Sequence, residues 1–177
     1  MPRGDAGMST HATQGLAPTE ENYLRVLSHF ATGVVAVTGL TPNGGPSGMT
    51  VSSFTSVSLE PRLVSFCIGQ TSRTWPVLRK SEGLCVNILA EQQQHVSARL
   101  ARSGERKFND LRWMPSPSGL PILSGVLAWI EGFIEAEHQA GDHVIVVVRI
   151  RHLGTQGDLL PLVRFRGAFH RLQERTE

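Results

Sequence analysis

The sequence contains few of the residues that disulfides, metal centres and membrane spans depend on. It has two cysteines among 177 residues, and each lies alone within an apolar run, VSFCIG around Cys67 and LCVNIL around Cys85. No apolar run approaches the roughly 20 residues of a membrane-spanning helix. We therefore expect two buried free thiols, and a soluble protein that does not span a membrane.

Two common nucleotide-binding motifs are also missing. No strand-like run is followed by GxGxxG, and GxxxxGK[ST] occurs nowhere. A nucleotide, if bound, is therefore not held by a Rossmann or Walker loop. The formal net charge is only +2, which is too small a bias to indicate a nucleic-acid partner.

The N-terminal residues carry no secretory signal. The run MPRGDAGMSTHATQG mixes small residues and charge without periodicity, so residues 1–18 are expected to form a disordered leader of a cytoplasmic protein. Residues 19–177 suffice for one domain, which would bury roughly 70% of its unfolded surface.

Hydrophobic periodicity predicts a helix first and then many short strands. After Pro18, apolar residues recur at helical spacing, with Thr19 available as N-cap and Gly33 past the end. Further helices are predicted over 74–83 and 91–101, and a long loop over 103–121. Strands are predicted over 34–40, 62–69, 84–89, 126–138, 143–153 and 162–172. Short strands joined mainly by turns favour an α+β fold with an antiparallel barrel over a doubly wound sheet.

The stretch GMTVSSFTSVSLEP, residues 48–61, places six hydroxyl side chains between Thr50 and Ser58. Met49 and Val51 share one face of an extended chain, and Phe54 falls on the opposite face. This spacing predicts two half-buried extended segments with a bend between them. Such a bend presents hydroxyl and N–H groups to a flat polar ligand, although hydroxyls that only cap strand ends would give the same pattern.

Six landmarks in order resemble the flavin reductase-like proteins, which have an FMN-binding split β-barrel and include the reductase components of two-component flavin-dependent monooxygenases. The landmarks are ATGVVAVT, GMTVSSFTSVSLEP, TSRTWPVLRKSEGLCVNIL, ARSGERKF, AGDHVIVVV and PLVRFRG. They cover nearly the whole chain from Asn22 onward. The resemblance implies an NAD(P)H:flavin oxidoreductase that releases reduced flavin to a separate monooxygenase by diffusion.

The resemblance also implies which residues hold the flavin. The hydroxyl-rich segment would contact the pyrimidine edge of the isoalloxazine ring and continue as a wall beside it. The residues expected in these two parts are Thr50, Val51, Ser52, Ser53, Ser56, Val57 and Ser58. Uncharged donors at this edge favour the reduced ring, on which negative charge gathers.

The phosphate end of the flavin is assigned in the same way. Ser72 and Thr74 precede a short helix and would hold the phosphate, although either could simply cap that helix. Arg106, Lys107 and Phe108 resemble the stretch that closes over the phosphate or adenylate end. A solvated basic face is the alternative interpretation of this stretch.

The nicotinamide side is assigned to two motifs. His143, in Gly-Asp-His at the start of a strand, would lie beside the flavin as the catalytic residue, and Arg166 would lie near the nicotinamide. The sequence departs from the family pattern at Phe169, where a tyrosine is common. A metal site could only be built from four side chains near this motif, Glu135, His138, Asp142 and His143. Their spacing matches no familiar zinc pattern, so no metal is expected.

Several alternatives stay open at this point. FMN or FAD, and NADH or NADPH, fit the sequence equally well. A flavin-binding module or carrier without reductase turnover is the rival interpretation, whereas a serine hydrolase is disfavoured because Ser47 lacks a GxSxG context. The resemblance further implies a homodimer, with the loop over 103–121 as a natural arm.

Overall fold

The computed structural model describes residues 15–172, apart from the side chain of Glu105. Most of the expected leader, residues 1–14, lies outside this range. The helices are α1 Glu20–Leu27, α2 Trp75–Leu78, η1 Glu91–Gln93, α3 Gln94–Leu100 and η2 Glu105–Phe108. The strands are β1 Thr32–Gly33, β2 Val35–Leu40, β3 Pro46–Val51, β4 Thr55–Leu59, β5 Arg62–Gly69, β6 Leu84–Ile88, β7 Trp113–Pro115, β8 Pro121–Leu123, β9 Ala128–Ala140, β10 His143–Thr155, β11 Val163–Phe165 and β12 Ala168–His170.

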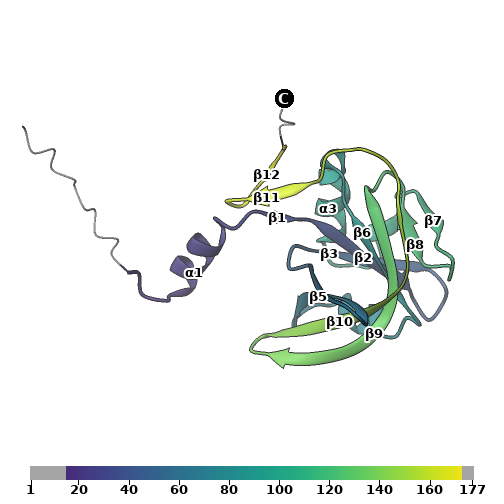
Figure 1. Ribbon diagram of the computed structural model, residues 1–177, viewed down its shortest axis with the longest axis horizontal. Coiled ribbons are helices and arrows are strands. Elements are labelled where there is room, and N and C mark those ends of the chain that lie inside the picture. The colour runs from purple at the N-terminus through teal and green to yellow at the C-terminus, as the bar shows by residue number, and fades with distance from the viewer. Residues whose placement is uncertain (1–14, 173–177) are drawn as a thin grey trace, which may run out of the picture.

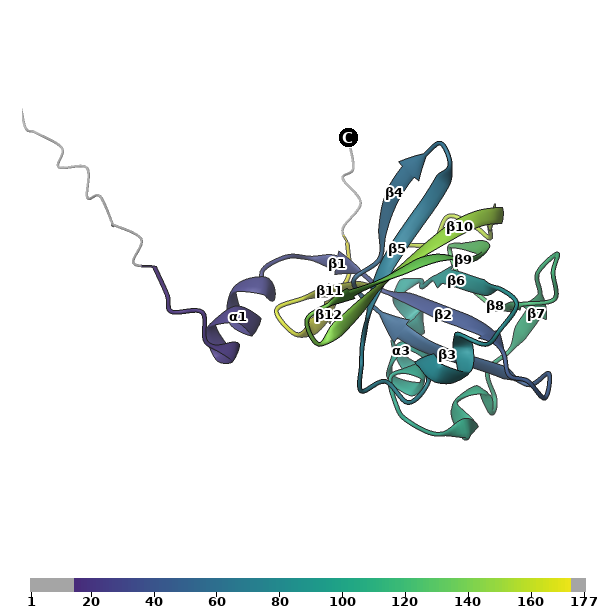
Figure 2. The ribbon, with the colours of Figure 1, turned by 90° about the horizontal axis from the view of Figure 1, so that it is seen from below.

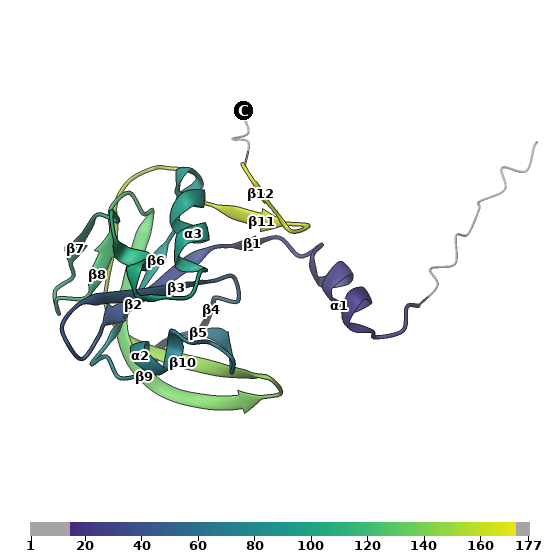
Figure 3. The same cartoon turned by 180° about the vertical axis from the view of Figure 1, so that it is seen from behind.

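Seven strands form one curved antiparallel sheet in the order β3-β2-β6-β9-β10-β5-β4 (Figure 1). The sheet is open, because its edge strands β3 and β4 each pair on one side only. The long hairpin β9–β10 bends along the outside and brings β5 back toward β3 (Figure 3). The predicted antiparallel architecture is confirmed, and the barrel is split rather than closed.

Strand β2 is the centre of the fold because both of its faces are buried. Val35 and Val37 pack inside the curve of the sheet against β5 and β10. Val34 and Ala36 face the opposite side, where α3 and the 103–126 segment cover the sheet. Because both faces of the strand are buried, successive residues are all apolar, which explains the VVAV sequence.

The segment over 103–121 is not the one long loop that the sequence predicted. It contains η2 and β7, and β7 pairs with β8. Phe108 and Leu120 are buried in the core beneath α3. The Gly, Pro and Ser residues of the segment predicted a loop, and its buried apolar residues were overlooked. The segment packs on the sheet of the same chain.

The element that stands apart from the sheet is α1 (Figures 1 and 2). Thr19 caps it as predicted, accepting a hydrogen bond from the Asn22 N–H at 3.3 Å. The helix ends at Leu27, earlier than expected, because the chain enters strand β1. No residue of α1 is buried, and Phe30 beyond it is 74% exposed. Helical spacing predicted the apolar face of α1. It did not predict that this face is left uncovered by the described chain.

The predicted strand over 162–172 is a hairpin, which corrects the sequence interpretation. Arg166 and Gly167 have φ values of 49° and 79°, so they form the turn between β11 and β12. This turn places Arg164 opposite Phe169. The Arg166 N–H donates to the Ser28 carbonyl at 2.8 Å and so joins the hairpin to the end of α1.

The hydroxyl-rich stretch folds as predicted. Strand β3 ends at Val51, residues 52–54 make the bend, and β4 begins at Thr55. Cys85 is a buried thiol as expected, whereas Cys67 on β5 is only half-buried. Within residues 15–172, no helix has the length and apolar character needed to cross a membrane.

Candidate functional site

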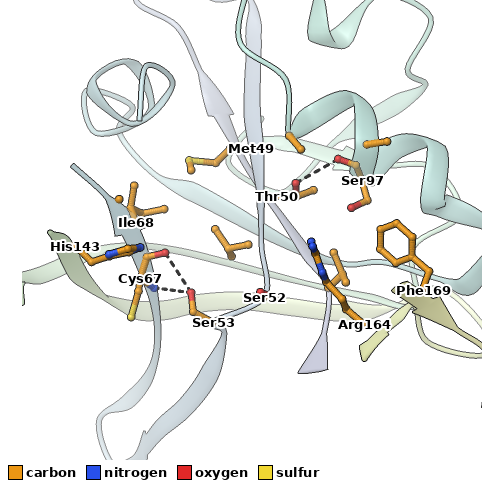
Figure 4. Close-up of a pocket in the computed structure, with 15 residues that line it drawn as sticks. Met49, Thr50, Ser52, Ser53, Cys67, Ile68, Ser97, His143, Arg164 and Phe169 are labelled. Carbon is orange, nitrogen blue, oxygen red and sulfur yellow. Dashed lines mark hydrogen bonds between the residues drawn. The ribbon is translucent and has the colours of Figure 1, made fainter. Parts of the chain in front are cut away.

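A cavity of about 530 Å³ lies beside the bend that follows β3 (Figure 4). Its walls come from β3 and the bend, from β5, from α3, and from the hairpin β11–β12. The lining residues are Val34, Met49, Thr50, Val51, Ser52, Ser53, Cys67, Ile68, Gly69, Ser97, Ala98, Ala101, His143, Arg164 and Phe169. We call this the ring cavity, because its lining combines hydroxyl-bearing and apolar residues, which the polar edge and the face of a flat ring would need. Four predicted wall residues, Thr50 to Ser53, and the predicted catalytic residue His143 therefore meet in one place.

The hydroxyl groups of the wall are not equivalent. The Thr50 hydroxyl donates to the Ser97 carbonyl at 3.3 Å and so ties β3 to α3. The Ser53 hydroxyl accepts from the Cys67 N–H at 2.8 Å and donates to the Cys67 carbonyl at 3.2 Å, which closes the seam between the bend and β5. Ser52 is exposed and makes no side-chain hydrogen bond within the described chain. Ser53 thus has the capping role that was the alternative interpretation, whereas Ser52 has its hydroxyl free for a ligand.

Three predicted wall residues lie elsewhere. Ser56, Val57 and Ser58 are on the edge strand β4 and line no part of the ring cavity. Val57 is 51% exposed. The bend places Ser52 at the ring cavity, and after the bend β4 runs away from the cavity.

A second cavity of about 270 Å³ adjoins the first and shares Met49, Thr50 and Ala101 with it. We call it the phosphate cavity because of its lining. The remaining residues are Thr71, Ser72, Arg73, Thr74, Leu100, Arg102, Ser103 and Lys107. Three of these side chains are cationic and none is acidic, and the predicted phosphate residues Ser72 and Thr74 lie among them.

Lys107 supplies a buried cation to the phosphate cavity, since the residue is 8% exposed. Its Nζ donates to Thr74 Oγ1 at 2.5 Å, and to the carbonyls of Gly48 and Leu100 at 3.3 Å each. Burial lowers the pKa of Lys107 from its ordinary 10.5. None of its three partners is a carboxylate, so an anion entering the cavity would stabilise this charge.

Ser72 and Thr74, the two hydroxyl residues before α2, make different contacts. The Ser72 hydroxyl accepts from the Trp75 N–H at 3.2 Å and so caps the short helix. Thr74 makes no capping bond. Because its oxygen accepts from Lys107, its own hydroxyl proton must point elsewhere, and the cavity lies beside it. Thr74 is therefore the hydroxyl best placed to donate to a ligand.

The other two residues of the predicted closing stretch lie outside both cavities. Phe108 is buried in the core under α3. Arg106 is exposed and lines a neighbouring groove. Only Lys107 of the three reaches the phosphate cavity.

His143 lies at the end of the ring cavity where β10 begins (Figure 4). Its Nδ1 lies 2.8 Å from Asp142 Oδ1. This hydrogen bond lowers the pKa of Asp142 below its ordinary value, and the charge of His143 adds to the effect. Gly141, with φ of 63°, makes the tight turn that presents both side chains at the tip of the β9–β10 hairpin.

Sequence reasoning singled out Arg166 and did not mention Arg164, which is the arginine that lines the ring cavity. Arg164 lines the ring cavity and points into it beside Phe169 (Figure 4). Arg166 lies in the turn, with its guanidinium carbon 5.1 Å from the Phe165 ring centroid. If Arg166-Gly167 had been read as a turn, the sequence would have predicted a hairpin. In that hairpin Arg164 pairs with Phe169, and both residues line the ring cavity.

The two cavities together suit a flat, mostly uncharged ring that carries an anionic tail. Strand β3 is a sheet edge along the ring cavity, so backbone groups as well as Ser52 are available to polar ring atoms. The tail would meet Arg73, Thr74 and Lys107. A flavin has this shape and charge, so the donors present fit it. Among the described residues, no three His, Cys, Asp or Glu side chains cluster as a metal site would need.

The fold and site define a split antiparallel barrel with two adjoining cavities that suit a ring compound with an anionic tail. The chain has neither a Rossmann nor a Walker loop. A family model described as "Flavin reductase like domain" matches residues 27–173. The chain belongs to the flavin reductase-like family, and the resemblance inferred from the sequence is confirmed.

Individual relatives agree with the family. The chain is 42% identical over 144 residues to a flavin reductase of Pseudomonas putida, covering 81% of this chain and 85% of the relative. It is 41% identical to the reductase subunit HsaB of a flavin-dependent monooxygenase of Rhodococcus jostii, over 81% of this chain and 73% of the relative. Among solved structures, it is similar to the NADH:FAD oxidoreductase SgcE6 of Streptomyces globisporus in complex with NAD and FAD fragments. That similarity has a TM-score of 0.85 and 28% identity, and it covers 93% of this chain and 99% of the other.

Proposed function

We propose that this protein is an NAD(P)H:flavin oxidoreductase that supplies reduced flavin to a separate flavin-dependent monooxygenase. The observation that carries the proposal is the junction of the ring cavity with the phosphate cavity at Met49, Thr50 and Ala101. A flavin mononucleotide unit has a ring and a phosphate that need this arrangement. Flavin reductases and monooxygenase reductase subunits among its relatives support the same conclusion.

The bound flavin supplies the hydride acceptor, and a reduced nicotinamide supplies the hydride. The task of the chain is to align the two rings and keep water away from them. Ser52 and the edge of β3 would hold the polar side of the flavin ring, and Ile68 and Val51 would pack on its apolar parts. Arg164 would bring positive charge near the ring, where the reduced state gathers negative charge.

His143 is assigned to the nicotinamide side of the ring cavity. Asp142 holds its Nδ1, which leaves Nε2 as the ring nitrogen directed away from that carboxylate. The imidazole would orient the nicotinamide rather than react with it, because hydride transfer needs no protein nucleophile. Phe169 would supply a stacking surface but no phenol hydroxyl at the other end of the cavity.

Steady-state oxidation of NADH and NADPH in the presence of FMN or FAD tests this proposal. We expect nucleotide oxidation that depends on added flavin and on enzyme concentration. A protein that binds flavin with micromolar affinity but does not accelerate oxidation of either nucleotide would instead be a flavin-binding module. Absence of flavin binding would refute both interpretations.

A further inference from the structure

The tip of the β9–β10 hairpin, residues 139–143, carries His143 and extends beyond most of its neighbours in the sheet. Strand β6 pairs with β9 from Ala128 to Gly132, so the rest of β9 pairs with β10 alone. On the other side, β5 pairs with β10 as far as the pair formed by Gly69 and His143. Every residue of the tip is exposed. Strand pairing with the rest of the sheet therefore does not extend to residues 139–142.

Gln70, the first residue after β5, holds the tip beyond the end of this pairing. Its backbone N–H donates to the Asp142 carbonyl at 2.9 Å. Its side-chain Nε2 donates to Gln139 Oε1 at 2.9 Å and to the Gly141 carbonyl at 3.0 Å. One residue thus binds the tip at three points, and two of these hydrogen bonds depend on the glutamine side chain.

A second anchor of the hairpin lies farther from the tip, at Glu137 of β9. Its carboxylate accepts from Trp75 Nε1 at 3.2 Å and pairs with the Arg79 guanidinium at 2.6 Å. These contacts hold β9 against α2 and do not extend to the turn. Within the described chain, Gln70 is the residue outside the hairpin that hydrogen-bonds to residues 139–142.

The position of the tip decides where the imidazole of His143 lies. Gly69 is the cross-strand partner of His143, and a Cβ atom on Gly69 would lie 3.7 Å from His143 Nε2. Both residues line the ring cavity. The imidazole is also bound to the tip through Nδ1, which lies 2.8 Å from Asp142 Oδ1. A displacement of the tip would therefore move Nε2 relative to the cavity wall.

We propose that Gln70 is a positioning residue for hydride transfer, because it holds the tip where His143 presents Nε2 to the nicotinamide. The inference rests on the proposed function, since it concerns the role assigned there to His143. Gln70 lines neither the ring cavity nor the phosphate cavity, so it acts through His143 and not by contact with the flavin. Small displacements matter at this site because hydride transfer needs two rings aligned at close range.

Steady-state kinetics with varied nucleotide tests the proposal. Gln70→Ala should lower kcat/KM for NADH or NADPH about threefold to fivefold, with an unchanged KM for the flavin. The loss should be smaller than that in His143→Asn, because the imidazole is still present. Gln139→Ala should have a smaller effect, about twofold, because Gln70 keeps the Gly141 carbonyl as an acceptor. Gln94→Ala is the matched control, since this exposed glutamine on α3 lines neither cavity and should change no kinetic constant.

A double-mutant cycle with His143→Asn distinguishes positioning from general support of the fold. In the His143→Asn background, Gln70→Ala should cause no further loss of kcat/KM, because the side chain that Gln70 positions is gone. An equal loss in both backgrounds would refute the proposal, since Gln70 would then act independently of His143. A loss of flavin affinity in Gln70→Ala would refute it as well, because Gln70 would then support the flavin site itself.

Amide hydrogen exchange gives a measurement that does not depend on turnover. Gln70→Ala should speed exchange within residues 139–143 about fivefold, as expected for the loss of a net hydrogen bond, and leave exchange in β2 unchanged. An unchanged kcat/KM in Gln70→Ala would refute the proposal whatever the exchange rates, and would leave the reductase function intact. A native protein that oxidises neither nucleotide would refute the proposed function and this inference with it, even if faster exchange in the variant showed that Gln70 holds the tip.

Discussion

Lys107 Nζ lies 2.5 Å from Thr74 Oγ1 and links the end of the 103–107 segment to the residue that precedes α2. The ammonium group is buried and has only carbonyl and hydroxyl partners. This pair joins two segments that are 33 residues apart in the sequence. It creates a fixed donor and a fixed charge at the place where the flavin phosphate is expected.

Lys107→Met should weaken the binding of FMN about tenfold or more, because a charge-assisted contact is lost. Riboflavin, which has no phosphate, should bind equally well to the variant and to the native protein. Fluorescence titration of the two flavins measures both effects. Thr74→Ser should retain the affinity for FMN, whereas Thr74→Val should reduce it. Equal losses for FMN and riboflavin would mean that Lys107 only supports the fold.

The pKa of Lys107 predicts a pH dependence in the alkaline range. Burial lowers this pKa below 10.5. Between the lowered value and 10.5 the unfolded chain holds a proton that the folded chain has lost, so the free energy of unfolding rises with pH there. The affinity for FMN should fall over the same range, since a neutral amine no longer attracts the phosphate. Lys107→Met should remove both trends, and an unchanged pH profile in the variant would contradict the assignment.

Substitutions of the hydroxyl residues at the bend should affect flavin affinity, the stability of the fold or both, depending on the residue. Ser52→Ala should weaken flavin binding about threefold to tenfold with an unchanged Tm, because its hydroxyl has no partner in the described chain. Ser53→Ala should lower the free energy of unfolding by about 1 kcal/mol, because Cys67 loses its partner. Thr50→Val should weaken both flavin binding and the fold, because Thr50 lines both cavities and its hydroxyl donates to the Ser97 carbonyl. Thermal denaturation and flavin titration of the same samples compare the two effects, and the opposite ranking of Ser52 and Ser53 would refute this division.

His143→Asn should lower kcat/KM for the nicotinamide nucleotide about tenfold while flavin affinity stays intact. The reason is that His143 lies at one end of the ring cavity, away from the phosphate cavity. Asp142→Asn should act in the same direction but less strongly, because it loosens the Nδ1 contact without removing the ring. Steady-state kinetics with varied nucleotide provides the measurement. A loss of flavin affinity in His143→Asn would instead place this residue on the flavin.

Glu131 should support the stability of the sheet without a part in the reaction. It is 1% exposed on β9, and its carboxylate accepts from the Ser118 hydroxyl at 2.6 Å and from the Ser118 N–H at 3.2 Å. Burial opposes its charge, but hydrogen bonds from Ser116 and Ser118 outweigh burial and lower the pKa of Glu131 below 4.5. Its contribution is therefore present above pH 4.5 and is lost as the pH falls through the lowered pKa.

Glu131→Gln should lower the free energy of unfolding at pH 7 by about 1–3 kcal/mol, because the Ser118 donors lose an ionised acceptor. The variant should also lose less stability on acidification than the native protein. Denaturant unfolding at pH 7 and pH 4 measures both effects. Ser118→Ala should reproduce the loss at pH 7, and unaltered stability in both variants would show that this buried contact contributes nothing net.

The exposed apolar face of α1 supports the homodimer that the family resemblance implies. Tyr23, Leu24, Leu27 and Phe30 are each more than half exposed. Leu24→Glu should therefore lower the mass in sedimentation at micromolar concentration from two subunits to one, because a carboxylate would be buried at the contact. Arg25→Gln, on the opposite side of the helix, is the control and should keep the mass. A native protein that sediments as one subunit would refute the dimer.

Local sequence determined much of this protein because periodicity and turn chemistry act over a few residues. The apolar runs around Val35 and Phe66 specified buried strands, and the hydroxyls from Thr50 onward specified an edge with a bend, which the structure places at the ring cavity. The order of motifs then identified the family. None of these inferences required knowledge of which strand lies beside which.

Only the tertiary structure decided the points that depend on contacts between distant segments. It placed Arg164 rather than Arg166 at the ring cavity, because the turn of the last hairpin sets which side chain faces the cavity. It buried Lys107 against Thr74, and it buried Glu131 on β9 beside the donors of Ser118. Burial and hydrogen bonding are properties of the assembled sheet and its covering segments, so sequence spacing alone does not contain them.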